Sequence, residues 1–284
     1  MPDLNYRNLI KKHQWLVFEE QVNPLKDQES VALAYQESFL RYLLQLNNQD
    51  HLNKPYGILH FYPIFKPSVF LGAKDKLLNN FSAGVAFLER EGYTLSIRPH
   101  GGLGVVEDDG ILNFAIVTDN RFVSLNIDQA FNFSLSTIQS SLNKYNLTLS
   151  AYEITDSYCP GKYDVVIDGK KVGGIAQRRY RDAVTTAAYI GISGDQIKRG
   201  QIMQGFYQIA QADDRFPQVN PYSMATLSDI LGQPISLADF QAHFIECLHK
   251  ESQIHPGRYQ DPNLQEIFHP LLIKAQQRSQ KIYN

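Results

Sequence analysis

The stretch YDVVIDGKKVGGIAQRR, residues 163–179, decides the fold of this chain. Two β-type runs, 163–168 and 171–178, flank the pair Asp168-Gly169, and an Asp-Gly pair between such runs is a strong signal for a β-hairpin. A third strand-like run, VTTAAYIGI, follows at 184–192. This order predicts a central sheet that is at least partly antiparallel.

Strand and helix patterns continue on both sides of this hairpin. The strand candidates that precede it lie at 56–71, as two short runs, and at 94–98, 103–106 and 111–118. Apolar residues at helical spacing predict helices at 28–46, at 76–91 with Gly92 as the C-terminal cap, and along Phe131, Leu135, Ile138 and Leu142. Past Gly194 we expect loops to about residue 225, then a helix capped by Ser236 and a last helix from about 262 to 282.

The expected fold class is therefore α+β, with a mixed, largely antiparallel sheet flanked by helices. Strands cluster in the middle of the chain, and helical patterns dominate its end. We expect one domain at 1–225 and a helical C-terminal segment at 226–284, which packs on that domain or is appended to it.

The composition indicates a globular chain of the cytoplasm. Its 27 Lys and Arg stand against 29 Asp and Glu, so a net charge of −2 provides no global attraction for nucleic acid or an anionic membrane. Two cysteines cannot form a disulfide framework, and residues 1–8 lack a secretory signal. No apolar run reaches the roughly 18 to 20 residues that span a bilayer. We therefore expect neither nucleic acid nor a membrane as a partner.

Of the two cysteines, Cys159 is the candidate nucleophile. It stands in SYCPG, residues 157–161, where the following proline disfavours helix and predicts an extended residue just before a turn. Cys247 instead lies in a helical apolar pattern, which suits a packed structural thiol. Since a free thiol is only a few per cent thiolate at neutral pH, a reactive Cys159 needs positive charge or a base nearby.

The hairpin after Cys159 provides such charge. Eight cationic residues oppose four aspartates between 159 and 200, namely Lys162, Lys170, Lys171, Arg178, Arg179, Arg181, Lys198 and Arg199. The alternative is that these side chains only form a solvated face of the sheet. Lys171 stands where the turn passes into the strand, and the paired Gly173 and Gly174 predict a close approach to the backbone there.

A second segment, RPHGGLGVVEDDGILN at 98–113, also has unusual composition. It matches neither the P-loop nor the dinucleotide-binding glycine motif, because strand patterns follow it. Taken alone, its glycines predict only a turn. The carboxylates at 107–109 alternate faces on a strand and converge poorly, and the histidines lack ligand spacing, so we expect no metal and no cofactor.

Together, the segments at 98–113 and 168–179 resemble the two signature segments of the lipoate and octanoate protein-ligase/transferase superfamily. The resemblance implies a fold similar to the catalytic domain of biotin protein ligase, with an acyl-binding tunnel, over about residues 25–250. Residues 1–225 would then be a catalytic acyltransferase domain. The ligases have three glycines and a His-Asp pair where this chain has Gly101-Gly102-Leu103 and Glu107-Asp108. This departure argues against an adenylating activity.

The run SYCPGKYD, with GGL and GILN in the earlier segment, is similar to one branch of that superfamily. That branch moves octanoyl groups from the glycine cleavage H protein to lipoyl domains, such as those of 2-oxoacid dehydrogenase E2 subunits, without ATP. The resemblance implies that Cys159 forms a thioester and that Lys171 is the active-site lysine. The substrate-binding residues that it implies are Arg98, His100, Gly101, Gly102, Gly174 and Gln177. The basic hairpin would dock acidic lipoyl domains.

Three alternatives remain open at this point. Octanoyl could come from acyl carrier protein, with the same cysteine, or lipoate could be ligated with ATP. In a different class, the chain could be an inactive module that binds lipoyl domains or fatty acids, with a structural Cys159. Formation of an octanoyl adduct on Cys159 discriminates the transferase from the module.

Overall fold

The computed structural model describes residues 6–23, 25, 29–48, 52–64 and 66–284. Its strands are β1 (Gln14–Glu19), β2 (Tyr56–Phe61), β3 (Ser68–Leu71), β4 (Thr94–Ile97), β5 (Val105–Glu107), β6 (Ile111–Asp119), β7 (Ser150–Ala151), β8 (Val165–Ile167), β9 (Lys170–Tyr180), β10 (Ala183–Gly191) and β11 (Ile254–Pro256). Its α-helices are α1 (Tyr6–Lys12), α2 (Glu29–Leu46), α3 (Phe81–Arg90), α4 (Asn120–Val123), α5 (Ile127–Leu142), α6 (Gln196–Ile209), α7 (Leu227–Leu231), α8 (Leu237–His249) and α9 (Pro262–Gln280). Short 3-10 turns lie at η1 (Glu20–Val22), η2 (Ala73–Leu77) and η3 (Asn143–Tyr145).

The strands form an eight-stranded sheet in the order β11-β1-β2-β6-β10-β9-β8-β7 and a three-stranded sheet in the order β4-β3-β5. In the large sheet β1 runs parallel to β2 and to β11, whereas the successive pairs from β2 to β8, namely β2-β6, β6-β10, β10-β9 and β9-β8, are antiparallel. The hairpin predicted at Asp168-Gly169 is present: both residues have positive φ, at 49° and 75°, as tight hairpin turns require. The prediction of an α+β fold with a mixed sheet is confirmed.

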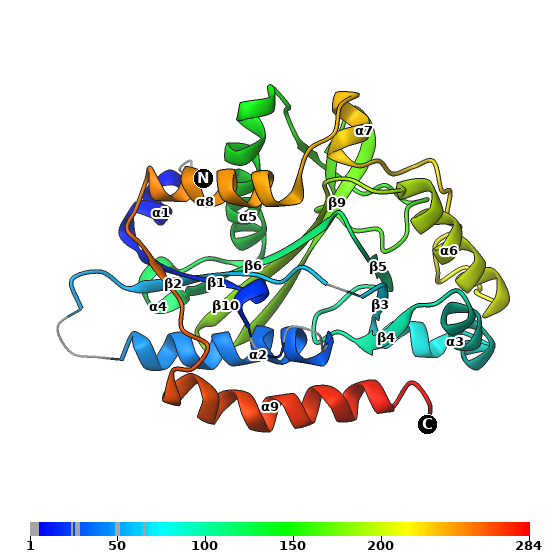
Figure 1. The fold of residues 1–284 in the computed structure, drawn as a ribbon, viewed down its shortest axis with the longest axis horizontal. Helices are drawn as coiled ribbons and strands as arrows, with labels where there is room; N and C mark the ends of the chain where they lie inside the picture. The colour runs from blue at the N-terminus through cyan, green and yellow to red at the C-terminus, as the bar shows by residue number, and fades with distance from the viewer. Residues whose placement is uncertain (1–5, 24, 26–28, 49–51, 65) are drawn as a thin grey trace.

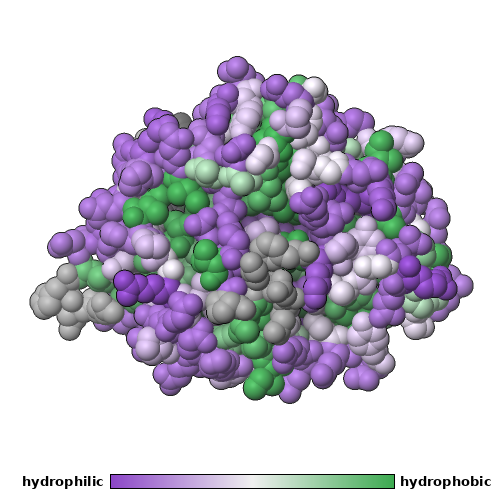
Figure 2. Space-filling model, in the orientation of Figure 1, coloured by the Kyte–Doolittle hydropathy of each residue, from purple (hydrophilic) through white to green (hydrophobic). Residues whose placement is uncertain are grey.

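Helices cover both faces of the large sheet (Figure 1). One face carries α5 and α8, whose apolar residues Ile138 and Phe244 share a core with Phe114 of β6. The opposite face carries α2, and α9 lies along the outer side of α2 (Figure 1). The small sheet stands at one end, beside α3 and α6. No helix in the described part of the chain is long and apolar enough to cross a membrane. The face seen in Figure 2 is mostly hydrophilic, with apolar residues in separate groups.

The largest error of the sequence prediction lies at 195–225, where we expected loops and the structure has the helix α6. Gly200 and Gly205 lie within this helix, and each is a packing contact. A Cβ atom on Gly200 would lie 2.6 Å from Cα of Pro221, and one on Gly205 would lie 2.8 Å from the ring of Phe87. Tertiary packing therefore outweighs the low helix propensity of glycine here.

The helix expected at 76–91 also begins later than predicted. Residues 73–77 form the 3-10 turn η2, and α3 starts only at Phe81. Asp75 explains the change, because its carboxylate accepts a hydrogen bond from the amide of Gly72 at 2.7 Å and so stabilises a separate turn. Gly92 follows the end of α3 with φ of 88°, as expected for a residue that terminates a helix.

The C-terminal segment contacts the rest of the chain at several places. Phe240 and Phe244 of α8 belong to the main core, and β11 adds a strand to β1. The ring of Phe268 in α9 stacks on Tyr35 of α2, with ring centroids 4.0 Å apart. The domain division at residue 225 stays a prediction.

Candidate active site

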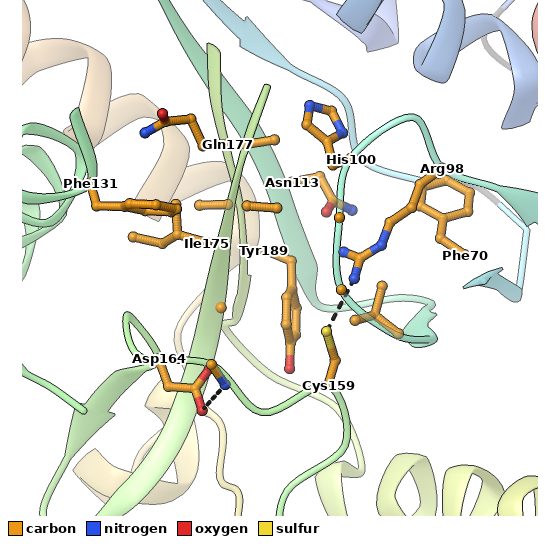
Figure 3. Close-up of a pocket in the computed structure, with 18 of the residues that line it drawn as sticks. Phe70, Arg98, His100, Asn113, Phe131, Cys159, Asp164, Ile175, Gln177 and Tyr189 are labelled. Atoms are coloured by element: carbon orange, nitrogen blue, oxygen red, sulfur yellow. Dashed lines mark hydrogen bonds between the residues drawn. The ribbon is translucent and has the colours of Figure 1, made fainter. Parts of the chain in front are cut away.

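A cavity of about 560 Å³ opens where the two signature segments meet. Seven of the residues predicted for the site line it, namely Arg98, His100, Gly101, Gly102, Cys159, Gly174 and Gln177. Its apolar wall consists of Leu33, Phe70, Val105, Ile127, Phe131, Ile175, Ala176, Ala187 and Ala188. Figure 3 shows Cys159 and Arg98 on one side of Tyr189, and Phe131 and Ile175 on the other. The two segments therefore form one site, as the resemblance implied.

The sulfur of Cys159 accepts two hydrogen bonds. Nη2 of Arg98 lies 3.1 Å from Sγ, and the backbone amide of Leu103 lies 3.2 Å from it (Figure 3). Nη2 of Arg98 also donates to the carbonyl of Leu103 at 2.6 Å, which holds the guanidinium in place. A cation and a backbone amide are therefore aimed at one sulfur. We had expected the positive charge at the thiol to come from the hairpin. It comes instead from Arg98 of the earlier segment.

The backbone of Cys159 differs from the prediction. We expected an extended residue, but φ is 49°, in the left-handed region. Proline at 160 favours an extended residue before it, so this conformation departs from the local preference. Contacts at both ends of the residue hold it there, since Arg98 binds the sulfur and Lys171 donates to the carbonyl oxygen at 2.7 Å. Non-glycine residues with this conformation are uncommon and often occur at functional sites.

Gly102 is the glycine that the site requires. Its φ is 95°, and a Cβ atom there would collide with Nη2 of Arg98 and lie 2.9 Å from Sγ of Cys159. At Gly101, by contrast, an added Cβ would meet no atom within 4 Å. For the glycine pair Gly173-Gly174 we predicted a close approach to the backbone. It is found at Gly173, against the backbone of Tyr189, whereas Gly174 lines the cavity.

Lys171 lies beneath the cysteine loop and is fully buried. Its ammonium group donates to Oγ of Ser157 at 3.1 Å and to the carbonyls of Tyr158 and Cys159 at 3.0 and 2.7 Å. It also forms an ion pair of 3.0 Å with Oδ1 of Asp164. Lys171 is not among the described residues that line the cavity. The lysine therefore contacts the main chain that carries the nucleophile, and its catalytic role stays a prediction.

Asp164 is a site residue that the sequence analysis missed. It lines the cavity and accepts hydrogen bonds from the amides of Ile154 and Gly161, each at 3.2 Å. Burial raises the pKa of its carboxyl group, and the charge of Lys171 opposes this effect. An acid at the start of the otherwise apolar run YDVVI was the available signal, because a buried carboxylate needs a cationic partner.

His100 and Gln177 lie at the side of the cavity away from Cys159 (Figure 3). Burial, together with the charges of Arg98, Arg178 and Arg278, lowers the pKa of His100 to about 3, so its imidazole is neutral. Its Nε2 atom has no hydrogen-bond partner among the described residues. Gln177 donates to the carbonyl of Ile127 at 3.1 Å.

Glu107 and Asn113 are further cavity residues that the prediction did not include. Nδ2 of Asn113 lies 2.5 Å from Oε2 of Glu107. Burial raises the pKa of Glu107 to about 8, so a neutral carboxylic acid faces the cavity at neutral pH. Its neighbour Asp108 pairs with Arg199 at 2.7 Å. Within the described residues, no three His, Cys, Asp or Glu side chains form a group that could hold a metal ion.

The basic hairpin is only partly available as a surface. Lys171 and Arg199 are buried in ion pairs with Asp164 and Asp108. The exposed members of the set are Lys162, Lys170, Arg179, Arg181 and Lys198. The expected docking surface is therefore smaller than the sequence suggested. Cys247 is half-buried, with Sγ 3.6 Å from the carbonyl of Ser140, and burial raises its pKa.

Solved structures with this fold are lipoate-protein ligases. A crystal structure of lipoate-protein ligase A bound with ATP has a TM-score of 0.67 and 19% identity, and covers 93% of this chain and 95% of that one. A bipartite lipoate protein ligase from Thermoplasma acidophilum has a TM-score of 0.62 and 18% identity, with coverage of 95% and 97%. Fold and site together define an enzyme domain of the lipoate-ligase type that carries a cysteine in its cavity.

Residues 29–249 match the lipoyl protein ligase A/B catalytic domain, and the chain belongs to this family. A lipoyl-[GcvH]:protein N-lipoyltransferase of Listeria monocytogenes is 38% identical over 61% of this chain, and the alignment spans 64% of that protein, slightly less than two thirds. Octanoyl-[GcvH]:protein N-octanoyltransferases of Lysinibacillus sphaericus and Bacillus velezensis are 34% and 30% identical over 71% and 76% of this chain, and over 74% and 77% of their own lengths.

Proposed function

We propose that this protein transfers octanoyl or lipoyl groups from the glycine cleavage H protein to lipoyl-domain lysines of 2-oxoacid dehydrogenase E2 subunits, through a thioester on Cys159, in the cytoplasm. The observation that carries the proposal is the sulfur of Cys159 in the wall of the cavity, held by Arg98 and the amide of Leu103. The names of its relatives, which act on the H protein, support the donor.

The first half-reaction is attack of the Cys159 thiolate on the carbonyl carbon of an octanoyl-lysine amide. A carbon–sulfur bond forms, the carbon–nitrogen bond breaks, and the departing lysine nitrogen takes up a proton. In the second half-reaction the amine of the acceptor lysine attacks the thioester. It loses a proton and releases the thiolate, which Arg98 again stabilises. Donor and product are equivalent amides, so the exchange needs no ATP.

The apolar wall of the cavity is suited to the acyl chain. Phe70, Val105 and Ile175 are among its lining residues. The small side chains of Ala176 and Ala187, which face each other on the paired strands β9 and β10, leave space in the cavity for the chain. Transfer of a chain from water into such a wall contributes about 0.8 kcal/mol for each buried methylene group. The chain would lie in the cavity with its carbonyl at Cys159.

Lys171 is the candidate for proton transfer to and from the lysine amines. Its Nζ atom lies 2.7 Å from the carbonyl of Cys159, so we assign it a second task, which is to hold the nucleophile loop. Asp164 would keep the ammonium group oriented through the ion pair of 3.0 Å. Removal of Lys171 would thus impair both proton transfer and the position of the nucleophile loop.

The test is mass spectrometry of the protein after incubation with octanoylated H protein, without ATP. An octanoyl adduct on Cys159, which disappears when an E2 lipoyl domain is added, is the expected result. Parallel reactions contain octanoyl-acyl carrier protein, or octanoate with ATP and magnesium. Loading of a lipoyl domain only with ATP would overturn the proposal in favour of a ligase. Tight binding of the H protein without any adduct would indicate a binding module.

A further inference from the structure

The C-terminal helix α9 lies outside the part of the chain that matches the family. Its last turn nevertheless contacts the segment that carries Arg98 of the active site. The match ends at residue 249, and α9 spans Pro262–Gln280. Oγ of Ser279 accepts a hydrogen bond from the amide of Ile97 at 3.2 Å. Ile97 directly precedes Arg98, the residue that binds the sulfur of Cys159. One contact from α9 therefore touches the segment that carries this arginine.

Arg278, the preceding residue of α9, contacts the same segment through two intermediates. Its Nη2 atom donates to Oε1 of Glu37 in α2, and the other oxygen, Oε2, accepts from Nη2 of Arg178 at 2.7 Å. Nη1 of Arg178 in turn donates to the carbonyl of Pro99 at 2.6 Å. Glu37 is 7% exposed, whereas the side chains of Arg178 and Arg278 are 37% and 21% exposed. The three ionic side chains connect α9, α2 and β9 to the residue that follows Arg98.

We propose that Arg278 is a positioning residue, which keeps Arg98 at the Cys159 sulfur by way of Glu37, Arg178 and the backbone of Pro99. A carboxylate held on both oxygens by two guanidinium groups has one orientation. Without Arg278, Glu37 can rotate, and Arg178 no longer holds Pro99 at a fixed place. The segment 97–99 then gains freedom, and Arg98 moves away from the sulfur.

Three further facts agree with this role. His100, on the other side of Pro99, experiences the charges of Arg98, Arg178 and Arg278 together. Near the end of α9, Lys76 donates to the carbonyl of Lys281 at 2.5 Å. The ring of Tyr283 donates through its hydroxyl to Glu89 at 2.9 Å. The end of the chain is thus attached to η2 and to α3, from which it can position the segment.

The inference rests on the proposed function for its meaning, but its first test does not depend on that function. In a Cys247→Ala background, the rate at which iodoacetamide alkylates Cys159 at pH 7 reports the thiolate directly. We expect Arg278→Ala to lower this rate on the order of tenfold, because small displacements of a catalytic group have effects of at least this size. Arg278→Lys should restore part of the rate. Lys274→Ala, at an exposed position of α9, is the matched control and should leave it unchanged.

The second test is octanoyl transfer by the same variants. We expect Arg278→Ala to lower kcat about as much as it lowers alkylation, with little change in KM. Arg178→Ala should have a similar effect, and the double variant should add little to it, since both act through one connection. If wild-type protein transfers no octanoyl group while alkylation responds as expected, the proposed function fails and the positioning role stands.

Two outcomes would overturn the positioning role. The first is an alkylation rate of Arg278→Ala within about twofold of wild type, when the variant is folded by circular dichroism. The second is a loss that merely follows the folded fraction in a thermal melt. If Arg278→Ala does not fold, Arg278→Gln and Ser279→Ala are measured in its place, and wild-type rates in both would equally overturn it.

Discussion

Nζ of Lys171 lies 2.7 Å from the carbonyl oxygen of Cys159 and donates a hydrogen bond to it. The lysine thus binds the main chain of the nucleophile, while Arg98 binds its side chain at 3.1 Å. These two contacts stabilise Cys159 with φ of 49°. The conformation of the candidate nucleophile therefore depends on two cations that come from different segments of the chain.

Substitution of the nucleophile gives the most direct prediction. Cys159→Ala should abolish octanoyl transfer while the protein stays folded and still binds the H protein. Loss of one sulfur in a loop should change the free energy of unfolding by less than about 1 kcal/mol. Cys247→Ala is the matched control and should retain activity. The acceptor mass after each reaction is the measurement, and efficient transfer by Cys159→Ala would mean that no thioester is involved.

Lys171→Ala should lower turnover by about 10²- to 10⁴-fold, the usual range for a group that transfers protons. It should also lower the free energy of unfolding by about 3 to 5 kcal/mol, because Asp164 then remains as a buried carboxylate without its partner. Urea denaturation and steady-state kinetics measure the two effects. Turnover within about threefold of wild type would remove Lys171 from the reaction and leave it a structural role.

Gly102→Ala should impair the site without affecting distant parts of the fold. The added methyl group would collide with Nη2 of Arg98 and strain a backbone of positive φ. We expect a loss of thioester formation on the order of tenfold or more, since Arg98 can no longer reach the sulfur. Gly191→Ala in β10 is the control, because Gly191 does not line the cavity and its added Cβ would meet only ordinary contacts, the nearest at 3.5 Å. Equal activities for the two variants would contradict this account.

Glu107 should make stability depend on pH. Burial raises its pKa from 4.5 to about 8, so between these values the folded state holds a proton that the unfolded state has released. The stabilisation from this proton is complete below pH 4.5. It decreases as the pH rises above that value and is lost once the pH passes about 8. Glu107→Gln should therefore have a flatter stability profile from pH 5 to pH 9 in urea denaturation. Parallel profiles for variant and wild type would exclude Glu107 as the cause.

The hairpin of the sheet could be predicted because its signal is local; the nucleophilic role of Cys159 also has a local signal and stays a prediction. Asp168-Gly169 between two β-type runs specifies a hairpin within a few residues. Pro160, the residue directly after Cys159, disfavours a helical conformation of the cysteine. Helix α6 could not be predicted in this way. Its two glycines have meaning only against Pro221 and Phe87, which lie elsewhere in the sequence.

The sequence by itself determined the α+β class, the candidate nucleophile Cys159, and the two segments that line the cavity. Only the tertiary structure decided which cation meets the sulfur, because Arg98 follows a strand of the small sheet and Cys159, 61 residues further along, precedes a strand of the large sheet. It likewise decided that Lys171 is buried against Asp164. The burial of a side chain and the charges that it meets depend on all residues near it in space. A local sequence pattern contains only the residues near it in the chain.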